Sequence, residues 1–161
     1  MKKQIKEIEP LKEIAPLIAS VQLNDIRLVE ASVSTRIRSA REAGEVNLAI
    51  SRSADIKDYH MADGILWVLA RIRMQLTPVE PGKDAAISVN AAFEIKYSFP
   101  KELKVSKGQL KTFARIQGMF NASPYWREFV QNMVGRMNLP PITLPVFRLE
   151  DSIKPKKEIS A

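Results

Sequence analysis

The chain has one histidine, and it lies in an acidic segment whose spacing suggests a metal site. Asp55, Asp58, His60 and Asp63 form the pattern D-x-x-D-x-H-x-x-D, which combines carboxylates with an imidazole. A metal site would require these groups to converge, and a second histidine is absent. The surrounding residues 51–63 are polar and are typical of a loop. We therefore expect a solvated loop and assign no metal ligand.

Patterns that would indicate catalysis are also missing. The chain has no cysteine, which excludes disulfides, thiolate metal sites and a thiol nucleophile. It has neither G-x-x-x-x-G-K-[ST] nor G-x-G-x-x-G, the loops that hold phosphates. A serine nucleophile would have only His60 as its base. The sequence therefore predicts a protein that is not an enzyme and needs no cofactor.

Two arginine pairs offer a different chemistry, contact with phosphate. Arg36 with Arg38, and Arg71 with Arg73, each place two guanidinium groups on one face of a strand. The net charge of +7 would suit nucleic acid or any acidic partner. Only Trp67 lies near enough in sequence to stack on a base. An ion-paired or solvated strand face is the favoured interpretation, and nucleic-acid binding is the alternative function.

Length and composition favour one compact domain without a membrane anchor. The chain has 161 residues, of which 45% are apolar, enough for a core. Glu7, Glu9 and Glu13 interrupt any apolar stretch of a signal peptide. No run approaches the roughly 20 apolar residues of a membrane span. We expect a soluble, cytoplasmic protein.

Four stretches have the pattern of β-strands: residues 21–37, 46–50, 65–76 and 87–99. In the last two, apolar residues alternate with others, as in antiparallel strands that bury one face. The first stretch has apolar residues on both sides, which indicates a bulge, a kink or burial of both faces.

Two helices are expected after the strands. Ser106 and Gln109 form a capping-box pattern that opens the first. Ser123 and Pro124 are typical of a second helix start, and Leu139 with two following prolines ends that helix. The second helix carries an apolar stripe spaced by threes and fours: Trp126, Phe129, Val130, Met133, Val134 and Met137.

The two ends of the chain carry weaker signals. Residues 2–18 form an amphipathic segment in which Pro10 and Pro16 predict a short or broken helix, which we interpret as a docking element. Residues 142–144 resemble a short strand. The order of elements predicts an α+β fold, a four-stranded antiparallel sheet with helices on one face. The expected divisions are an N-terminal segment at 1–19, a domain at 20–149 and a charged tail at 150–161.

The stretch 120–148 also carries a family resemblance. It contains Pro124-Tyr125-Trp126-Arg127-Glu128, a helix with Met133 and Arg136, and then Leu139-Pro140-Pro141-Ile142-Thr143-Leu144. This resembles the late helix and following loop of the SecB export chaperones, and the SecB-like chaperones of toxin–antitoxin systems still more closely. Weaker matches extend the resemblance over residues 20–148: Asp25-Ile26, Glu45-Val46-Asn47-Leu48 and Lys107-Gly108-Gln109.

The resemblance implies a long crossover after the first strand and the function of an ATP-independent holdase. Such a chaperone binds unfolded or aggregation-prone polypeptides in apolar grooves, for export or for antitoxin control. It also implies a homotetramer built as a dimer of dimers. The client-binding residues would be Val46, Leu48, Ile50, Tyr97, Phe99, Phe113 and Phe120. The oligomer interface would comprise Tyr125, Trp126, Phe129, Val130, Met133 and Met137.

Two departures from the family pattern limit this transfer. Export chaperones of the family bind the SecA motor through carboxylates on the exposed sheet, whereas this chain has Val29 near one such position and Arg71 and Arg73 on a strand face. SecA is therefore a doubtful partner. The C-terminal lid helix of the export chaperone is also missing from the short charged tail. Residues 1–19 are the candidate to cover the groove instead.

Overall fold

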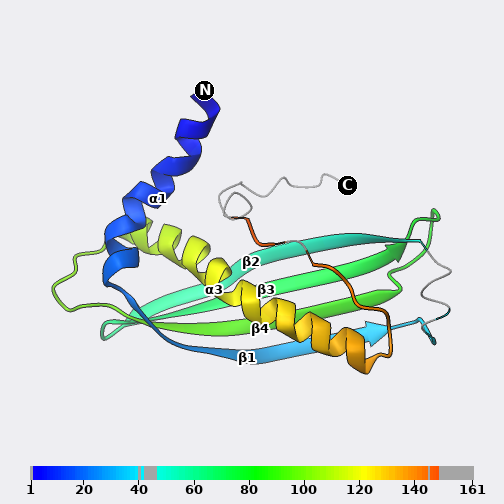
Figure 1. Ribbon diagram of the computed structural model, residues 1–161. Helices are drawn as coiled ribbons and strands as arrows, with labels where there is room; N and C mark the ends of the chain where they lie inside the picture. The colour runs from blue at the N-terminus through cyan, green and yellow to red at the C-terminus, as the bar shows by residue number, and fades with distance from the viewer. Residues whose placement is uncertain (1, 40, 42–46, 145, 149–161) are drawn as a thin grey trace.

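A four-stranded sheet forms the body of the protein, with α3 across one face and α1 at one end (Figure 1). The computed structural model describes residues 2–39, 41, 47–144 and 146–148. The elements follow in the order α1 (Lys2–Ser20), β1 (Gln22–Thr35), β2 (Leu48–Ala62), β3 (Ile65–Pro78), β4 (Ile87–Ser98) and α3 (Lys107–Arg136). The predicted α+β class is confirmed.

The order of strands in the sheet is β1-β4-β3-β2, and every neighbouring pair is antiparallel. Although β1 and β2 are consecutive in sequence, they form opposite edges of the sheet. The chain must therefore pass from one edge to the other between Thr35 and Leu48. This is the long crossover that the family resemblance implies. Residues 40 and 42–46 of this connection lie outside the described part of the chain.

The face that carries α3 holds the core. On β3 the side chains at every second position from Leu66 to Leu76 are buried, and on β4 the same holds from Ile87 to Tyr97. Both alternations are as predicted, because successive strand side chains point to opposite faces. α3 lays its buried residues, among them Trp126, against this apolar surface. We call the opposite side of the sheet the open face.

The second strand is longer than predicted. Residues 51–62 were expected in a loop, but they belong to β2, which pairs with β3 from Leu48 opposite Pro78 to Ala62 opposite Ile65. Their polar composition reflects an edge position with much of the strand exposed to solvent. Cross-strand hydrogen bonds to the well-formed β3 determine the conformation here. The composition of the segment does not reveal them.

The first strand contains the irregularity that its two-sided apolar pattern predicted. Its register against β4 shifts between Leu23 and Asp25, and again between Leu28 and Glu30. Each shift is a bulge, which places two residues opposite one. A strand with bulges changes which of its side chains face the core, so apolar residues that follow no single alternation are accommodated.

One continuous helix replaces the two that were predicted. Ser106 caps α3 as expected, with both hydrogen bonds of the capping box to Gln109 at 3.1 Å. Ser123 and Pro124, however, lie inside α3, and Ser123 is buried. Proline removes the N–H that would bond the carbonyl four residues earlier. That carbonyl belongs to Phe120, and burial of residues on both sides of the proline favours continuing the helix.

The N-terminal segment is also one helix rather than a broken one. α1 contains both Pro10 and Pro16, yet it continues to Ser20. Ile14 and Leu17 are fully buried, and the Gln109 side chain of α3 donates a hydrogen bond to the Glu13 carbonyl at 3.2 Å. Packing against α3 thus compensates for the two prolines. The docking interpretation is confirmed.

The segment after α3 does not form the predicted strand. Residues 142–144 are irregular, and they return over the helix-bearing side of the sheet (orange in Figure 1). Leu139 and Leu144 are buried in the main core. The segment is therefore held by side-chain burial rather than by a β-ladder. The predicted tail, residues 150–161, lies outside the described residues, and the predicted domain boundaries stay a prediction.

Candidate functional site

Two of the predicted client-binding residues are large apolar side chains exposed at the surface. Ile50 on β2 is 49% exposed, and Phe120 on α3 is 52% exposed. Leu48 at the start of β2 is half-buried, and Val46 lies outside the described residues. Ile50 faces the side of the sheet that carries α3, because its cross-strand partner Leu76 is a core residue. The exposed members are therefore able to meet another polypeptide without any rearrangement.

The three predicted aromatic contacts lie beneath the surface. Phe113 stacks edge-on against Tyr97 and Phe99, with ring centroids 5.2 and 5.4 Å apart. All three side chains are buried. The Asn121 amide donates a hydrogen bond to the Tyr97 hydroxyl at 2.9 Å. Burial raises the pKa of Tyr97 to about 12, and the Asn121 hydrogen bond opposes this shift.

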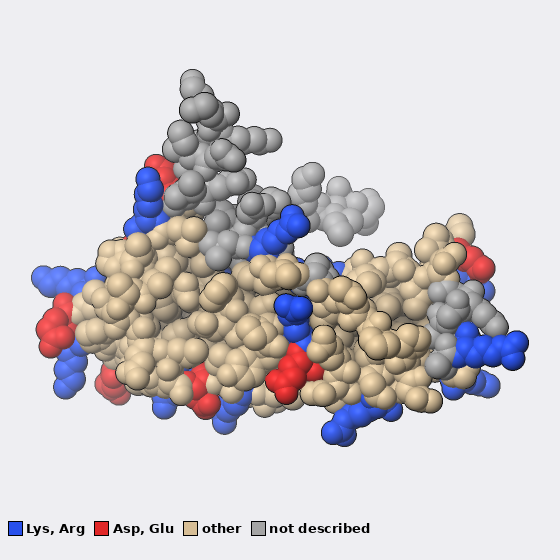
Figure 2. Space-filling model, viewed as in Figure 1, with Lys and Arg blue, Asp and Glu red and all other residues tan. Residues whose placement is uncertain are grey.

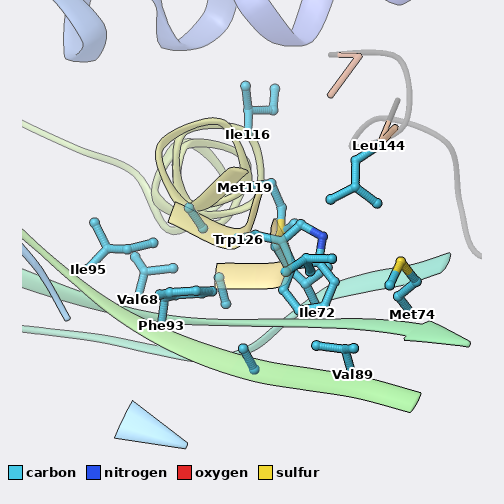
Figure 3. Close-up of a cluster of buried hydrophobic side chains, with 14 of the residues drawn as sticks. Val68, Ile72, Met74, Val89, Phe93, Ile95, Ile116, Met119, Trp126 and Leu144 are labelled. Atoms are coloured by element: carbon cyan, nitrogen blue, oxygen red, sulfur yellow. The ribbon is translucent and has the colours of Figure 1, made fainter. Parts of the chain in front are cut away.

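The residues predicted for the oligomer interface also divide into buried and accessible side chains. Trp126 and Val130 are completely buried under their own chain. In Figure 3 Trp126 lies between α3 and the strands, with Ile72 beside it and Leu144 on the side of the indole nitrogen. That nitrogen has no hydrogen-bond partner among the described residues. Phe129, Met133 and Met137 are half-buried, and Tyr125 is exposed.

Sequence reasoning missed a second exposed apolar region, on the opposite edge strand. Leu23, Leu28 and Val29 of β1 are each more than two-fifths exposed. An edge strand also presents backbone groups that another chain can pair with. The signal was the apolar residues on both sides of this strand. That pattern predicts a bulge, a kink or burial of both faces, and it also indicates side chains that the core does not take up.

The surface on the helix-bearing side is mostly uncharged. Figure 2 shows uncharged residues over much of this side, with Lys, Arg, Asp and Glu at the ends, along the lower margin and in a strip across the middle. Exposed apolar groups within such a region offer area to another apolar surface, while the charged margin keeps the protein from associating through it indiscriminately. This arrangement suits binding to an apolar partner surface.

Comparison with known proteins is consistent with this geometry. No family model matches the chain. Two curated relatives from Mycobacterium tuberculosis do: the SecB-like chaperone Rv1957 of strain H37Rv, 25% identical, and the SecB-like chaperone MT2006 of strain CDC 1551, 26% identical. Each match extends over 154 residues, 88% of this chain and 85% of the relative.

A solved structure agrees in fold. It shows M. tuberculosis Rv1957 in complex with a ChAD peptide from the HigA1 antitoxin, and it has a TM-score of 0.71 and 21% identity to this chain. The alignment covers 85% of this chain and 97% of that one. The chain is similar in sequence to SecB-like chaperones and shares the fold of one of them. The predicted resemblance is thereby confirmed.

The sheet arranges the acidic cluster around His60 along a strand. Asp55 lies opposite Arg71, and the imidazole of His60 stacks on Trp67 with ring centroids 4.8 Å apart and planes inclined by 8°. The ammonium of Lys96 lies 5.9 Å from the centre of the same indole. Within the described ranges no three acidic, imidazole or thiol groups are grouped as metal ligands would be.

The arginines considered for phosphate contact are partly engaged with acidic residues of the same chain. Arg71 donates to Glu30 at 3.2 Å, and Arg36 donates to Asp84 at 2.9 Å. Intramolecular pairs of this kind correspond to the ion-paired strand face that the sequence favoured. The alternative function in nucleic-acid binding gains no support from them.

Proposed function

We propose that this SecB-like protein is an ATP-independent holdase that binds unfolded or aggregation-prone polypeptides. The observation that carries the proposal is the likeness, over most of both chains, to a chaperone seen with an antitoxin peptide bound. The exposed apolar side chains on an uncharged surface supply the physical basis, since they can bury area against many client sequences. The protein performs no chemistry on its client.

The client is an antitoxin segment or a protein awaiting export. Both are chains that expose apolar residues before they fold or reach their destination. Binding takes place in the cytoplasm, and among the described residues no helix is long and apolar enough to cross a membrane. SecA has no assigned part in this proposal, because basic side chains, Arg71 and Arg73, stand on the open face.

The proposed client contacts are Ile50, Phe120 and Leu48, together with Val46, which lies outside the described residues. Tyr97, Phe99 and Phe113 support this surface from below, because the structure leaves them little accessible area. Residues 1–19 are the proposed border of this groove, and the packing of α1 on α3 supports that proposal. Shallow apolar contacts tolerate variation in client sequence and are not screened by salt as phosphate contacts are.

The proposed assembly is a homotetramer, a dimer of dimers. Tyr125, Phe129, Met133 and Met137 supply its helix contacts, since part of each side chain remains accessible. Trp126 and Val130 stabilise the helix from within the subunit. Several grooves in one closed assembly raise the effective concentration of weak contacts on a long client. Light scattering of the purified protein tests the assembly.

An aggregation assay tests the function. The double substitution Ile50→Ser and Phe120→Ser should weaken client binding about thirtyfold, if each side chain contributes roughly 1 kcal/mol by burying its exposed part. The readout is the molar ratio of chaperone needed to halve the light scattering of a denatured test protein. Val29→Ser is the matched control, because Val29 is 45% exposed and lies on β1, at the opposite edge of the sheet from β2.

The expected result is loss of protection by the double variant, with circular dichroism and thermal stability close to those of the parent. Protection by the parent protein should persist in salt that abolishes binding to DNA. If the parent is monomeric and the test protein precipitates as fast as in buffer, the holdase proposal is wrong. If the double variant protects as well as the parent, these residues are not the contacts.

A further inference from the structure

The open face contains a polar hollow that the proposed client groove does not use. Its volume is about 320 Å³. The side chains around it come from β1, β3 and β4 and are Glu30, Ser32, Arg71, Arg73, Gln75 and Asn90. All of them lie on the face opposite α3. Those on β3 and β4 alternate with core residues along their strand, and those on β1 lie opposite such residues of β4.

The register explains why the face is hollow here. Ala92 of β4 lies between Glu30 of β1 and Arg71 of β3, and the two long side chains meet above it at 3.2 Å. Ala92 is 1% exposed as a result. One tier along, Asn90 lies between Ser32 and Arg73. The ion-paired row of Glu30, Ala92 and Arg71 closes the hollow on one side. The row of Ser32, Asn90 and Arg73, which we call the open tier, leaves space above the sheet.

In the open tier the short side chains bond to each other and leave the arginine available. The Asn90 amide donates to the Ser32 hydroxyl at 3.0 Å. Arg73 is exposed, and within the described part of the chain it has neither an ion pair nor a hydrogen bond to its side chain. Arg71 is held in place by Glu30, with its side chain only 19% exposed. The hollow therefore combines one fixed and one unpaired guanidinium.

The charge of the hollow selects the class of ligand. Two guanidinium groups and the Glu30 carboxylate leave a surplus of one positive charge, which matches one carboxylate. Arginine binds a carboxylate through two parallel hydrogen bonds, an arrangement that a lysine ammonium does not offer. A polyanion would meet further carboxylates on the same face, from Asp25, Asp55 and Glu94. The open face is thus suited to an isolated acidic group and unsuited to a nucleic-acid backbone.

Neighbouring side chains indicate that the carboxylate belongs to a polypeptide. On β3 the row that ends with Arg71 and Arg73 begins with Trp67 and Leu69, and both are partly accessible. Side chains two positions apart on a strand are separated by about 6.6 Å, so the apolar and basic halves of the row lie within the length of a short extended segment. A peptide carrying an acidic residue near an apolar one would contact both halves.

We propose that the hollow on the open face binds a glutamate or aspartate side chain in an acidic segment of a partner protein. Arg73 donates to the carboxylate, Arg71 contributes a fixed positive charge, and Leu69 and Trp67 receive the neighbouring apolar side chain. The site lies on the opposite side of the sheet from the client groove. Its occupancy is therefore independent of the holdase activity proposed above.

The test uses the full-length protein and two blocked peptides, Ala-Phe-Ala-Ala-Glu-Ala and the same sequence with Gln in place of Glu. Binding is followed by NMR, through the backbone amide signals of residues 71, 73 and 90–92. The Glu peptide should shift these signals at concentrations where the Gln peptide does not. Arg73→Gln should weaken the Glu peptide about tenfold, as expected for loss of a hydrogen bond between charged groups.

Two further variants separate a binding role from a structural one. Glu30→Gln removes the competing carboxylate, so it should tighten binding of the Glu peptide, whereas a merely structural pair predicts no gain. Lys111→Gln is the control, because Lys111 is an exposed residue of α3 and its loss changes net charge equally. All three variants should still suppress aggregation.

Equal shifts by the two peptides would overturn the proposal, and so would an Arg73→Gln variant that binds the Glu peptide like the parent. Stronger perturbation of the same signals by single-stranded DNA than by the Glu peptide would assign the hollow to phosphate instead and would likewise contradict it. None of these outcomes bears on the holdase assay, so failure of one proposal leaves the other standing.

Discussion

The two faces of the sheet use the same strands for different purposes. On β3 the side chains from Leu66 to Leu76 that face α3 are all buried, whereas those of the same strand on the open face include Arg71 and Arg73. The covered face joins the main apolar cluster, and the open face carries ion pairs, a stacked histidine and a polar hollow. Most of the folding free energy is expected from burial on the covered face. The side chains of the open face contribute less to stability and can therefore determine which partner is bound.

The two tryptophans of the chain are a matched pair across this difference. Trp126 is 1% exposed and lies within the core, whereas Trp67 stacks on His60 at the open face. If the comparison is right, equal chemical changes at the two positions should have very unequal effects. The predictions that follow test this contrast, beginning with the largest effect.

Trp126→Ala should lower the free energy of unfolding by about 3–5 kcal/mol, because it removes a completely buried ring and leaves a cavity. Trp67→Ala should cost less, about 1–2 kcal/mol, since Trp67 is only half-buried, between His60 and Lys96. Urea unfolding followed by circular dichroism measures both values. Similar losses in the two variants would show that the open face contributes to stability as much as the covered face.

Alkaline pH should destabilise the protein through Tyr97 on the covered face. Burial raises the pKa of this phenol to about 12 from an ordinary value of 10, so between these values the unfolded chain loses a proton that the folded chain keeps. Stability is therefore fully present below pH 10 and falls as the pH rises toward 12, by up to roughly 3 kcal/mol.

The measurement is the free energy of unfolding in urea at a series of pH values from 9 to 12. Tyr97→Phe is the control, because it keeps the ring and removes the titrating hydroxyl. The slope between pH 10 and 12 should be smaller in this variant. An identical slope would mean that other groups cause the alkaline loss.

The smallest effect compares two glycines of α3, one packed on the sheet and one exposed to solvent. A Cβ at Gly118 would lie 2.8 Å from Cγ1 of Val68, so Gly118→Ala should cost about 1–3 kcal/mol by overpacking the contact between helix and sheet. At Gly135 an added Cβ meets nothing within 4 Å, and Gly135→Ala should stabilise the helix by about 0.5–1 kcal/mol. Thermal unfolding would show shifts of opposite sign. Stabilisation by both substitutions would show that α3 lies farther from the sheet.

The predicted site illustrates what one sequence can reveal about exposure. Leu48, Ile50, Phe99 and Phe113 are all apolar residues of the predicted strands and helices, and nothing in their spacing separates the exposed Ile50 from the buried Phe113. The difference depends on which neighbour covers each side chain. The resemblance to SecB-like proteins supplied the candidates, and the packing of α1 and α3 distinguished among them.

Local interactions determined the features that the sequence predicted well. The alternation of β3 and β4, the cap at Ser106 and the apolar stripe of the late helix each depend on residues a few positions apart. Their free energies do not require distant partners, so the pattern can be read directly.

Tertiary structure alone decided the rest. β2 extends through polar residues because β3 pairs with it, α3 continues through Pro124 because both flanking turns are buried on the sheet, and α1 contains two prolines because Ile14 and Leu17 are buried. The hollow between Asn90 and Arg73 likewise exists only through the register of three strands. In each case contacts between segments far apart in sequence outweigh the local secondary-structure preference. One sequence alone does not reveal which distant segments come into contact.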